Sequence, residues 1–162
     1  MIGNLILVKH DDFISKFIRW YTKSEFNHVG LFIDDNNIIE AGSRCGVRKI
    51  KFNYYKNKKS NKELDFSIYK VKNLNEEQKE RMKNFALKEV GISYDFLQFI
   101  CVGIFYIFGK LRKLEPIDLH GWICSELIAE NFYEVGIKFQ EDVDPDNITP
   151  TDIAKSTIIM DV

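Results

Sequence analysis

The stretch Asn27-His28-Val29-Gly30-Leu31-Phe32-Ile33 is an apolar run that begins on a histidine. Its length and its β-branched and aromatic residues predict a buried strand that starts at His28. A second stretch, Gly121-Trp122-Ile123-Cys124-Ser125-Glu126-Leu127-Ile128, leads through a tight approach into an amphipathic helix headed by Cys124. These two stretches give the chain its candidate chemistry and most of its predicted fold.

Cys124 and His28 are a suitable pair for nucleophilic catalysis. A thiol at a helix N-terminus lies in a positive field that favours the thiolate. An imidazole carried by a strand is the usual partner that completes the activation. If the fold brings these two side chains together, the sequence predicts a cysteine-dependent hydrolase or acyl-transferase.

A histidine base is normally oriented by a third polar group, and Glu40 is the best candidate. It lies in the apolar segment Ile38-Ile39-Glu40-Ala41, which follows the turn signal Asp34-Asp35-Asn36-Asn37 and predicts the partner strand. The length of the loop decides whether Glu40 can serve. A two-residue loop places Glu40 opposite Leu31, on the wrong face of the sheet from His28.

A three-residue loop, Asp34-Asp35-Asn36, instead pairs Ile33 with Asn37 and places Glu40 opposite Gly30. Glu40 is then a same-face diagonal neighbour of His28, at roughly 7 Å between the Cβ atoms. We expect Asn36 to adopt the left-handed conformation that this loop needs. We also expect Gly30, which has no side chain, to leave room for the carboxylate. The chemistry therefore predicts the three-residue loop.

Length and composition indicate a single domain over residues 1–162, with 45% hydrophobic and 14% aromatic residues to supply a core. A net charge of -1 gives no global basic field, so we expect no nucleic-acid partner. The three cysteines, Cys45, Cys101 and Cys124, form no CxxC pair and no disulfide framework, so no metal site is expected. The N-terminus lacks the features of a signal peptide, which favours a cytoplasmic location.

The segment from Phe96 to Phe108 is the longest apolar run, and it is shorter than the roughly 17 residues that span a bilayer. It is expected to be a buried core helix. The alternative is an interfacial membrane contact, since Lys110, Arg112 and Lys113 follow it.

The predicted elements mix helices with a mostly sequential antiparallel sheet, which defines an α+β fold. The predicted strands are Asn4 to Lys9, His28 to Ile33, Ile38 to Ala41, Val47 to Phe52, Leu64 to Val71 and Thr157 to Met160. The predicted helices run from Asp11 or Asp12 through Tyr21, from Asn75 to Gly91, over Phe96 to Phe108, from Cys124 through about Tyr133, and from Thr149 onward with Pro150 at the first helical position.

Each candidate residue also has an ordinary structural interpretation. An isolated histidine at a strand start is often a satisfied core or surface residue. A cysteine on an apolar helix is often inert packing, and a glutamate in a short strand often faces solvent. His120, four residues before Cys124, is a loop histidine or an alternative base, and no partner is evident for His10.

The segments that carry these residues resemble a known family. His28-Val29-Gly30-Leu31-Phe32-Ile33, a turn and Ile39-Glu40-Ala41 resemble the histidine hairpin of the NlpC-type papain-like amidases, and Ile123-Cys124-Ser125-Glu126-Leu127 resembles their nucleophile helix. The histidine comes first and the cysteine last, which is the reverse of the standard order. That order is similar to the circularly permuted branch, which includes the lecithin–retinol acyltransferase-like enzymes.

By position, this resemblance implies Cys124 as nucleophile, His28 as general base and Glu40 as the orienting group. The segment Gly91-Ile92-Ser93-Tyr94-Asp95 is similar to the one before the nucleophile helix, and Tyr94 matches a tyrosine that contributes to the oxyanion site. A core-edge aromatic is the alternative for Tyr94. The resemblance implies a permuted papain-like fold and no cofactor.

Three functions remain open at this point. The first is an amidase or peptidase that acts through an acyl-enzyme on a small peptide-like or acyl-amide substrate. The second is a lipid-directed acyltransferase or thioesterase at a membrane surface, through Phe96 to Phe108. The third is a binding module without turnover. The sequence gives neither the substrate nor the oligomeric state.

Overall fold

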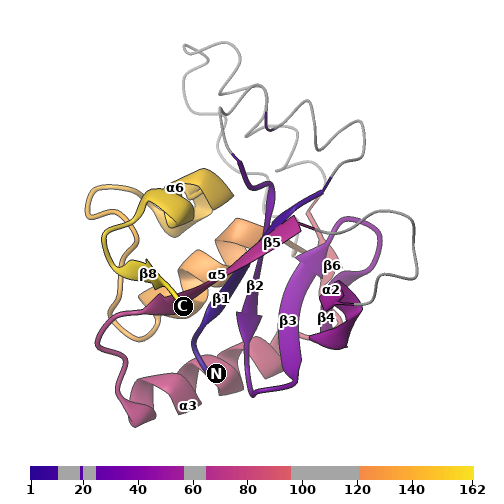
Figure 1. Cartoon of the computed structure of the whole chain (residues 1–162), viewed down its shortest axis with the longest axis horizontal. Helices are drawn as coiled ribbons and strands as arrows, with labels where there is room; N and C mark the ends of the chain where they lie inside the picture. Colours follow the sequence, from indigo (N-terminus) through magenta and orange to yellow (C-terminus); the bar gives the residue numbers. More distant parts are fainter. Residues whose placement is uncertain (11–18, 20–24, 57–64, 96–120) are drawn as a thin grey trace.

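The protein is built around one antiparallel sheet, seen in a computed structural model that describes residues 1–10, 19, 25–56, 65–95 and 121–162 (Figure 1). Its six strands lie in the order β4-β3-β2-β1-β5-β8. Their bounds are Leu5–Lys9 for β1, His28–Phe32 for β2, Asn37–Gly42 for β3, Gly46–Lys51 for β4, Asp65–Val71 for β5 and Ile159–Asp161 for β8.

Helices cover this sheet and connect its strands. They are α2 (Asn53–Lys56), α3 (Glu76–Lys88), α5 (Cys124–Tyr133), α6 (Pro150–Lys155) and the 3₁₀ turn η1 (Pro145–Asn147). Helix α5 packs on β2 and β3, and α3 packs on α5 (Figure 1). The architecture is therefore α+β, as the sequence predicts.

Both faces of the central strands are buried, which explains why these strands read as apolar runs rather than as alternating patterns. One face contributes Leu7, Val29, Leu31 and Ile39 to a core shared with α5. The opposite face contributes residues to a second cluster with Phe52 and Tyr55; these are Ile6, Val8, Phe32 and Ile38. His28 and Glu40 have the same parity as this second set, so they belong to the second face.

Local signals fix the ends of two helices. The Asn75 side chain accepts a hydrogen bond from the Gln78 backbone N–H, and the Gln78 side chain accepts one from the Asn75 backbone N–H, so a capping box opens α3 at the predicted start. Thr149 caps α6 in the same way, with Pro150 at the first helical position. Both helix starts are confirmed.

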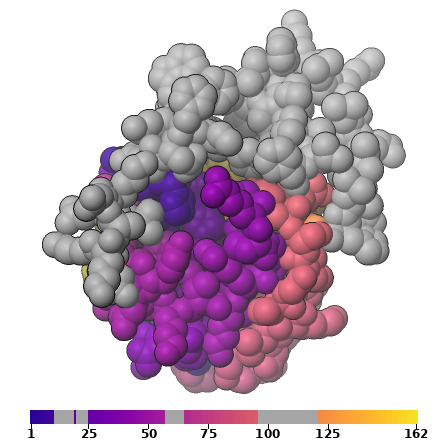
Figure 2. All heavy atoms as spheres, turned by 90° about the vertical axis from the view of Figure 1, so that its right-hand side faces the viewer, coloured from indigo at the N-terminus to yellow at the C-terminus, as the bar shows by residue number. Residues whose placement is uncertain are grey.

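The structure also contains a small parallel pair that the sequence pattern does not predict. Strands β6 (Ser93–Tyr94) and β7 (Gly121–Trp122) pair Ser93 with Gly121 and Tyr94 with Trp122. The segment before β6 also extends the edge of the main sheet, since Val47 N–H donates to the Ile92 carbonyl at 2.8 Å and Gly91 N–H to the Val47 carbonyl at 2.9 Å. Figure 2 shows this side of the molecule, where the β2–α2 segment (purple) borders the α3–β6 segment (salmon).

Several sequence-based predictions fall outside the described residues. These are the helix ending at Tyr21, the helix over Phe96 to Phe108 with Cys101, and His120. Across the parts of the chain that the structure describes, none of the helices combines the length and the apolar character needed to cross a bilayer.

Candidate active site

The β2–β3 hairpin places Glu40 beside His28. Leu31 pairs with Ile39, and Ile33 N–H donates to the Asn37 carbonyl at 3.1 Å, so the register puts Glu40 opposite Gly30. The predicted three-residue loop is therefore confirmed. Across the hairpin, His28 Nε2 lies 2.8 Å from Glu40 Oε2.

Two details of that hairpin differ from expectation. Asn36 does not adopt a positive φ. The Asp34 carboxylate holds the turn instead, because its Oδ1 accepts hydrogen bonds from the N–H groups of Asn36 (2.7 Å) and Asn37 (2.8 Å). The space at Gly30 is also taken by other side chains, since a Cβ there would lie 2.8 Å from Ile38 Cγ2 and 3.2 Å from Ile6 Cγ2. The missing side chain therefore admits apolar packing rather than the carboxylate.

Glu40 binds two further residues that the sequence did not single out. Arg48, directly opposite Glu40 in the β3–β4 register, donates from Nε (2.9 Å) and Nη2 (2.7 Å) to Oε1. The Tyr55 hydroxyl, from α2, donates to Oε2. In the sequence, Arg48 could have been recognised only as a charged residue in the strand predicted to follow the one that carries Glu40. Glu40 is 2% exposed and yet fully engaged by donors.

These contacts determine the charge states of the pair. Burial raises the pKa of Glu40, but the charge of His28 and hydrogen bonds from His28, Tyr55 and Arg48 outweigh it and lower that pKa to about 2. Burial likewise lowers the pKa of His28. The charge of Glu40 and hydrogen bonds with Cys124 and Glu40 dominate and raise it to about 10. Glu40 is therefore a carboxylate, and His28 is poised to hold an imidazolium charge.

Cys124 is the first residue of α5 and is 8% exposed. The Ile123 N–H donates to Glu126 Oε2 at 3.1 Å, which closes the first turn of the helix. Interaction with Cys124 is among the causes that raise the pKa of His28, so the thiol lies near the imidazole. His28 is the first residue of β2, one of the strands that α5 contacts.

Tyr94 also lies at this site, although Cys124 follows it only after a long interval in the sequence. The β6–β7 pairing closes that interval, because Tyr94 pairs with Trp122, two residues before Cys124. Burial and the charge of Cys124 raise the pKa of Tyr94, so its hydroxyl keeps its proton at neutral pH. Its side chain is half-buried.

His10 is a neighbour of the site that sequence reasoning missed. Its ring lies 5.4 Å from the His28 ring, centroid to centroid, at 58°. Asn27 fixes the backbone there, since His10 N–H donates to Asn27 Oδ1 at 2.9 Å and Asn27 Nδ2 donates to the His10 carbonyl at 3.0 Å. Cys45, in contrast, is an exposed thiol in the β3–β4 turn.

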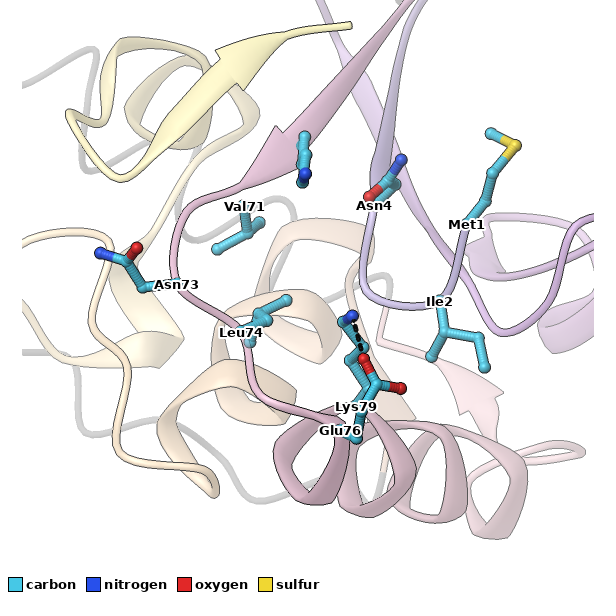
Figure 3. Close-up of a pocket in the computed structure, with 9 residues that line it drawn as sticks. Met1, Ile2, Asn4, Val71, Asn73, Leu74, Glu76 and Lys79 are labelled. Atoms are coloured by element: carbon cyan, nitrogen blue, oxygen red, sulfur yellow. Dashed lines mark hydrogen bonds and ion pairs between the residues drawn. The ribbon is translucent and has the colours of Figure 1, made fainter.

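A pocket of about 530 Å³ lies beside the N-terminal end of β1 (Figure 3). His28 pairs with Val8, near the other end of this strand. Asn4, Val71 and Leu74 line the pocket, and the Lys79–Glu76 ion pair, 2.6 Å long, closes one side. None of the candidate catalytic residues contributes to this pocket.

Comparison with known proteins identifies the family of the chain. Residues 2–155 match the family described as permuted papain-like amidase enzyme, YaeF/YiiX, C92 family. The chain belongs to this family. The permuted papain-like amidases of the C92 family are cysteine hydrolases, so the protein is an enzyme of that general class. The resemblance inferred from the His28 hairpin and the Cys124 helix is confirmed at the level of the family.

A solved structure supports the same fold for this C92 family member. The chain is similar to metalloprotein YiiX from Escherichia coli O157:H7, with a TM-score of 0.72 and 17% sequence identity. The alignment covers 100% of this chain and 96% of YiiX. No curated protein matches the sequence. The permuted papain-like fold is thus established.

Proposed function

We propose that the protein is a cysteine amidase or peptidase that acts through Cys124, His28 and Glu40 on a small peptide-like or acyl-amide substrate. The observation that carries this proposal is the position of the His28 imidazole, whose Nε2 lies 2.8 Å from Glu40 Oε2 and whose pKa is raised in part by Cys124. Since Nε2 is bonded to Glu40, Nδ1 is the nitrogen left for the Cys124 sulfur.

In the first half of the reaction, His28 holds the proton of the Cys124 thiol and the thiolate attacks the substrate carbonyl carbon. A C–S bond forms while the carbonyl π electrons move to oxygen. The tetrahedral intermediate then collapses, the C–N bond breaks, and His28 gives its proton to the leaving nitrogen. The product is a thioester on Cys124.

In the second half, His28 removes a proton from water, which attacks the thioester carbon. The C–S bond breaks, the acid product leaves, and the thiolate returns beside the imidazolium. Glu40 fixes the orientation of His28 throughout and stabilises its positive charge.

Two groups support the developing oxyanion in this proposal. The backbone N–H of Cys124 is one of the first N–H groups of α5, which have no acceptor within the helix. The Tyr94 hydroxyl is the second, because its β6 strand is paired with β7 next to the nucleophile.

YiiX is described as a metalloprotein. Within residues 1–10, 19, 25–56, 65–95 and 121–162 of the present chain, no group of three or more His, Cys, Asp or Glu side chains is placed to hold a metal ion. The donor set of these residues therefore does not fit a metal centre.

The test is to profile wild type and Cys124→Ala against a library of acyl-amide, peptide and thioester probes. We expect wild type to release amine from at least one amide class with a burst of acyl-enzyme, and Cys124→Ala to release none. His28→Ala and Glu40→Gln are expected to lose activity, and Cys45→Ser is the matched control that keeps it. Amide turnover that survives in Cys124→Ala would overturn the proposal.

A further inference from the structure

Both oxygens of the Glu40 carboxylate have assigned partners. Oε1 accepts two N–H groups from one guanidinium, that of Arg48. Oε2 accepts from the Tyr55 hydroxyl and faces His28 Nε2. A glutamate whose end is held in this way cannot exchange its two oxygens by rotating about its last side-chain bond without breaking bonds to charged or buried donors.

The two donors are themselves held by separate elements. Arg48 stands directly across the β3–β4 ladder from Glu40, and its guanidinium lies 5.3 Å from the centre of the Tyr54 ring. Tyr55 is 4% exposed and packs edge-on against Phe66, with 6.3 Å between ring centres. The orientation of the carboxylate is therefore fixed from the sheet on one side and from α2 on the other.

Burial gives these contacts their importance. A carboxylate that is 2% exposed prefers the neutral form unless donors stabilise its charge. A neutral Glu40 would offer His28 no negative charge, and an ionised but rotated Glu40 would offer it a poorly aligned oxygen. Either change would weaken the imidazolium that the proposed mechanism needs.

We infer that Arg48 and Tyr55 are positioning residues of the active site, which act through Glu40 by holding its carboxylate ionised and aimed at His28. This inference rests on the proposed function, because it assigns the two residues to the same catalytic group. Charged or titratable residues surround the Glu40–His28 pair in the described elements. Arg48 on β4 and Tyr55 on α2 contact Glu40. His10 beside β1 and Cys124 on α5 lie near His28, and Tyr94 lies next to Cys124.

The test measures alkylation of Cys124 by iodoacetamide between pH 4 and 9, followed by mass spectrometry of the Cys124 peptide. This readout needs no known substrate and separates Cys124 from the exposed Cys45. The variants are Arg48→Gln, which removes the charge, Arg48→Lys, which keeps the charge and loses the two-pronged contact, and Tyr55→Phe, which removes only the hydroxyl. Amide turnover of the same variants is measured in parallel.

We expect Arg48→Gln to move the acid limb of the alkylation profile to higher pH, because Glu40 then takes up a proton more readily. Turnover should fall about 10- to 100-fold, the effect expected for losing hydrogen bonds to a charged group. Tyr55→Phe should shift the profile in the same direction by less. Arg48→Lys should restore most of the wild-type profile, which a merely structural role for Arg48 would not require.

Two matched controls accompany these variants. Lys49→Gln removes the same charge from the neighbouring exposed position of β4, and Tyr133→Phe removes the same hydroxyl from an exposed tyrosine. Both should keep the wild-type profile. If Arg48→Gln does not fold, as judged by thermal unfolding, the milder Tyr55→Phe decides the question, because Arg48→Lys is expected to resemble wild type.

The possible results separate the two proposals. Wild-type profiles and turnover in Arg48→Gln and Tyr55→Phe, with Cys124→Ala inactive, would overturn this inference and leave the proposed function intact. An active Cys124→Ala would overturn the proposed function itself.

Discussion

Trp122 and Glu89 join the strand before the nucleophile to the end of α3. The Trp122 indole N–H donates to Glu89 Oε2 at 2.8 Å, and the indole ring also meets Phe85 edge-on. Trp122 lies in β7, two residues before Cys124. This contact therefore fixes the point from which the Cys124 helix starts.

We predict that Trp122→Phe destabilises the fold by about 1.5–3 kcal/mol, because it keeps an aromatic ring and removes a hydrogen bond to a charged group. Urea unfolding of Trp122→Phe, Glu89→Gln and the double variant forms the test. The two single effects should not add, since both variants weaken the same bond. Fully additive effects would show that the contact contributes little.

Glycine at position 30 is required by packing. We predict that Gly30→Ala costs about 1–3 kcal/mol, because the new methyl group overlaps the Ile38 Cγ2 atom. Ile38→Leu removes the branch at Cβ, so the double variant Gly30→Ala with Ile38→Leu should regain part of that loss. Denaturant midpoints measure both. If the double variant regains no stability, the contact with Ile38 is not the source of the strain in Gly30→Ala.

The Glu40–His28 pair predicts a dependence of stability on pH. The pKa of Glu40 is lowered from 4.5 to about 2, so its contribution is present above about pH 4.5 and is lost as the pH falls toward 2. The pKa of His28 is raised from 6.5 to about 10, so its contribution is present below about pH 6.5 and is lost as the pH rises toward 10. The pair therefore stabilises the fold most between about pH 4.5 and 6.5.

The measurement is the free energy of unfolding of wild type and His28→Asn at pH 5.5, 7.5 and 9. The difference between the two proteins should be largest at pH 5.5 and should shrink with rising pH. A difference that stays constant across this range would contradict the assigned charge states.

Tyr94 can be tested separately from the activation of the thiol. If its hydroxyl supports the oxyanion, Tyr94→Phe should lower kcat for amides by about 100- to 1,000-fold. It should leave alkylation of Cys124 by iodoacetamide unchanged, because that reaction forms no oxyanion. Tyr133→Phe is the control. Equal loss in both reactions would assign Tyr94 a structural role.

The sequence was sufficient to predict the register of the β2–β3 hairpin, for a geometric reason. Side chains alternate along a strand, so of the two-residue and the three-residue loop only the latter puts Glu40 and His28 on the same face. The helix that starts at Cys124 and the capping boxes of α3 and α6 were also predictable, because their signals are local. The conformation of Asn36 was predicted wrongly, because the Asp34 carboxylate satisfies the turn without a left-handed residue.

The residues around the hairpin were harder to predict from the sequence. Arg48 and Tyr55 reach Glu40 through the β3–β4 register and a single turn of helix, and neither has a periodic signal. Strands β6 and β7 have two residues each, which is too short for any alternation to be recognised. His10 meets His28 only because β1 and β2 are antiparallel neighbours that pair Val8 with His28.

The parallel pairing of β6 with β7 has a consequence for how such enzymes can diversify. The chain leaves this pair after Tyr94 and returns to it at Gly121, so both ends of the intervening stretch lie next to the β6–β7 pairing. We therefore predict that this stretch can be exchanged while Cys124 keeps its position. The test replaces the stretch between Asp95 and Gly121 with a glycine–serine connector and measures the rate at which Cys124 is alkylated. A wild-type rate would support the prediction. A lower rate would show that the natural stretch helps to position the helix that begins at Cys124.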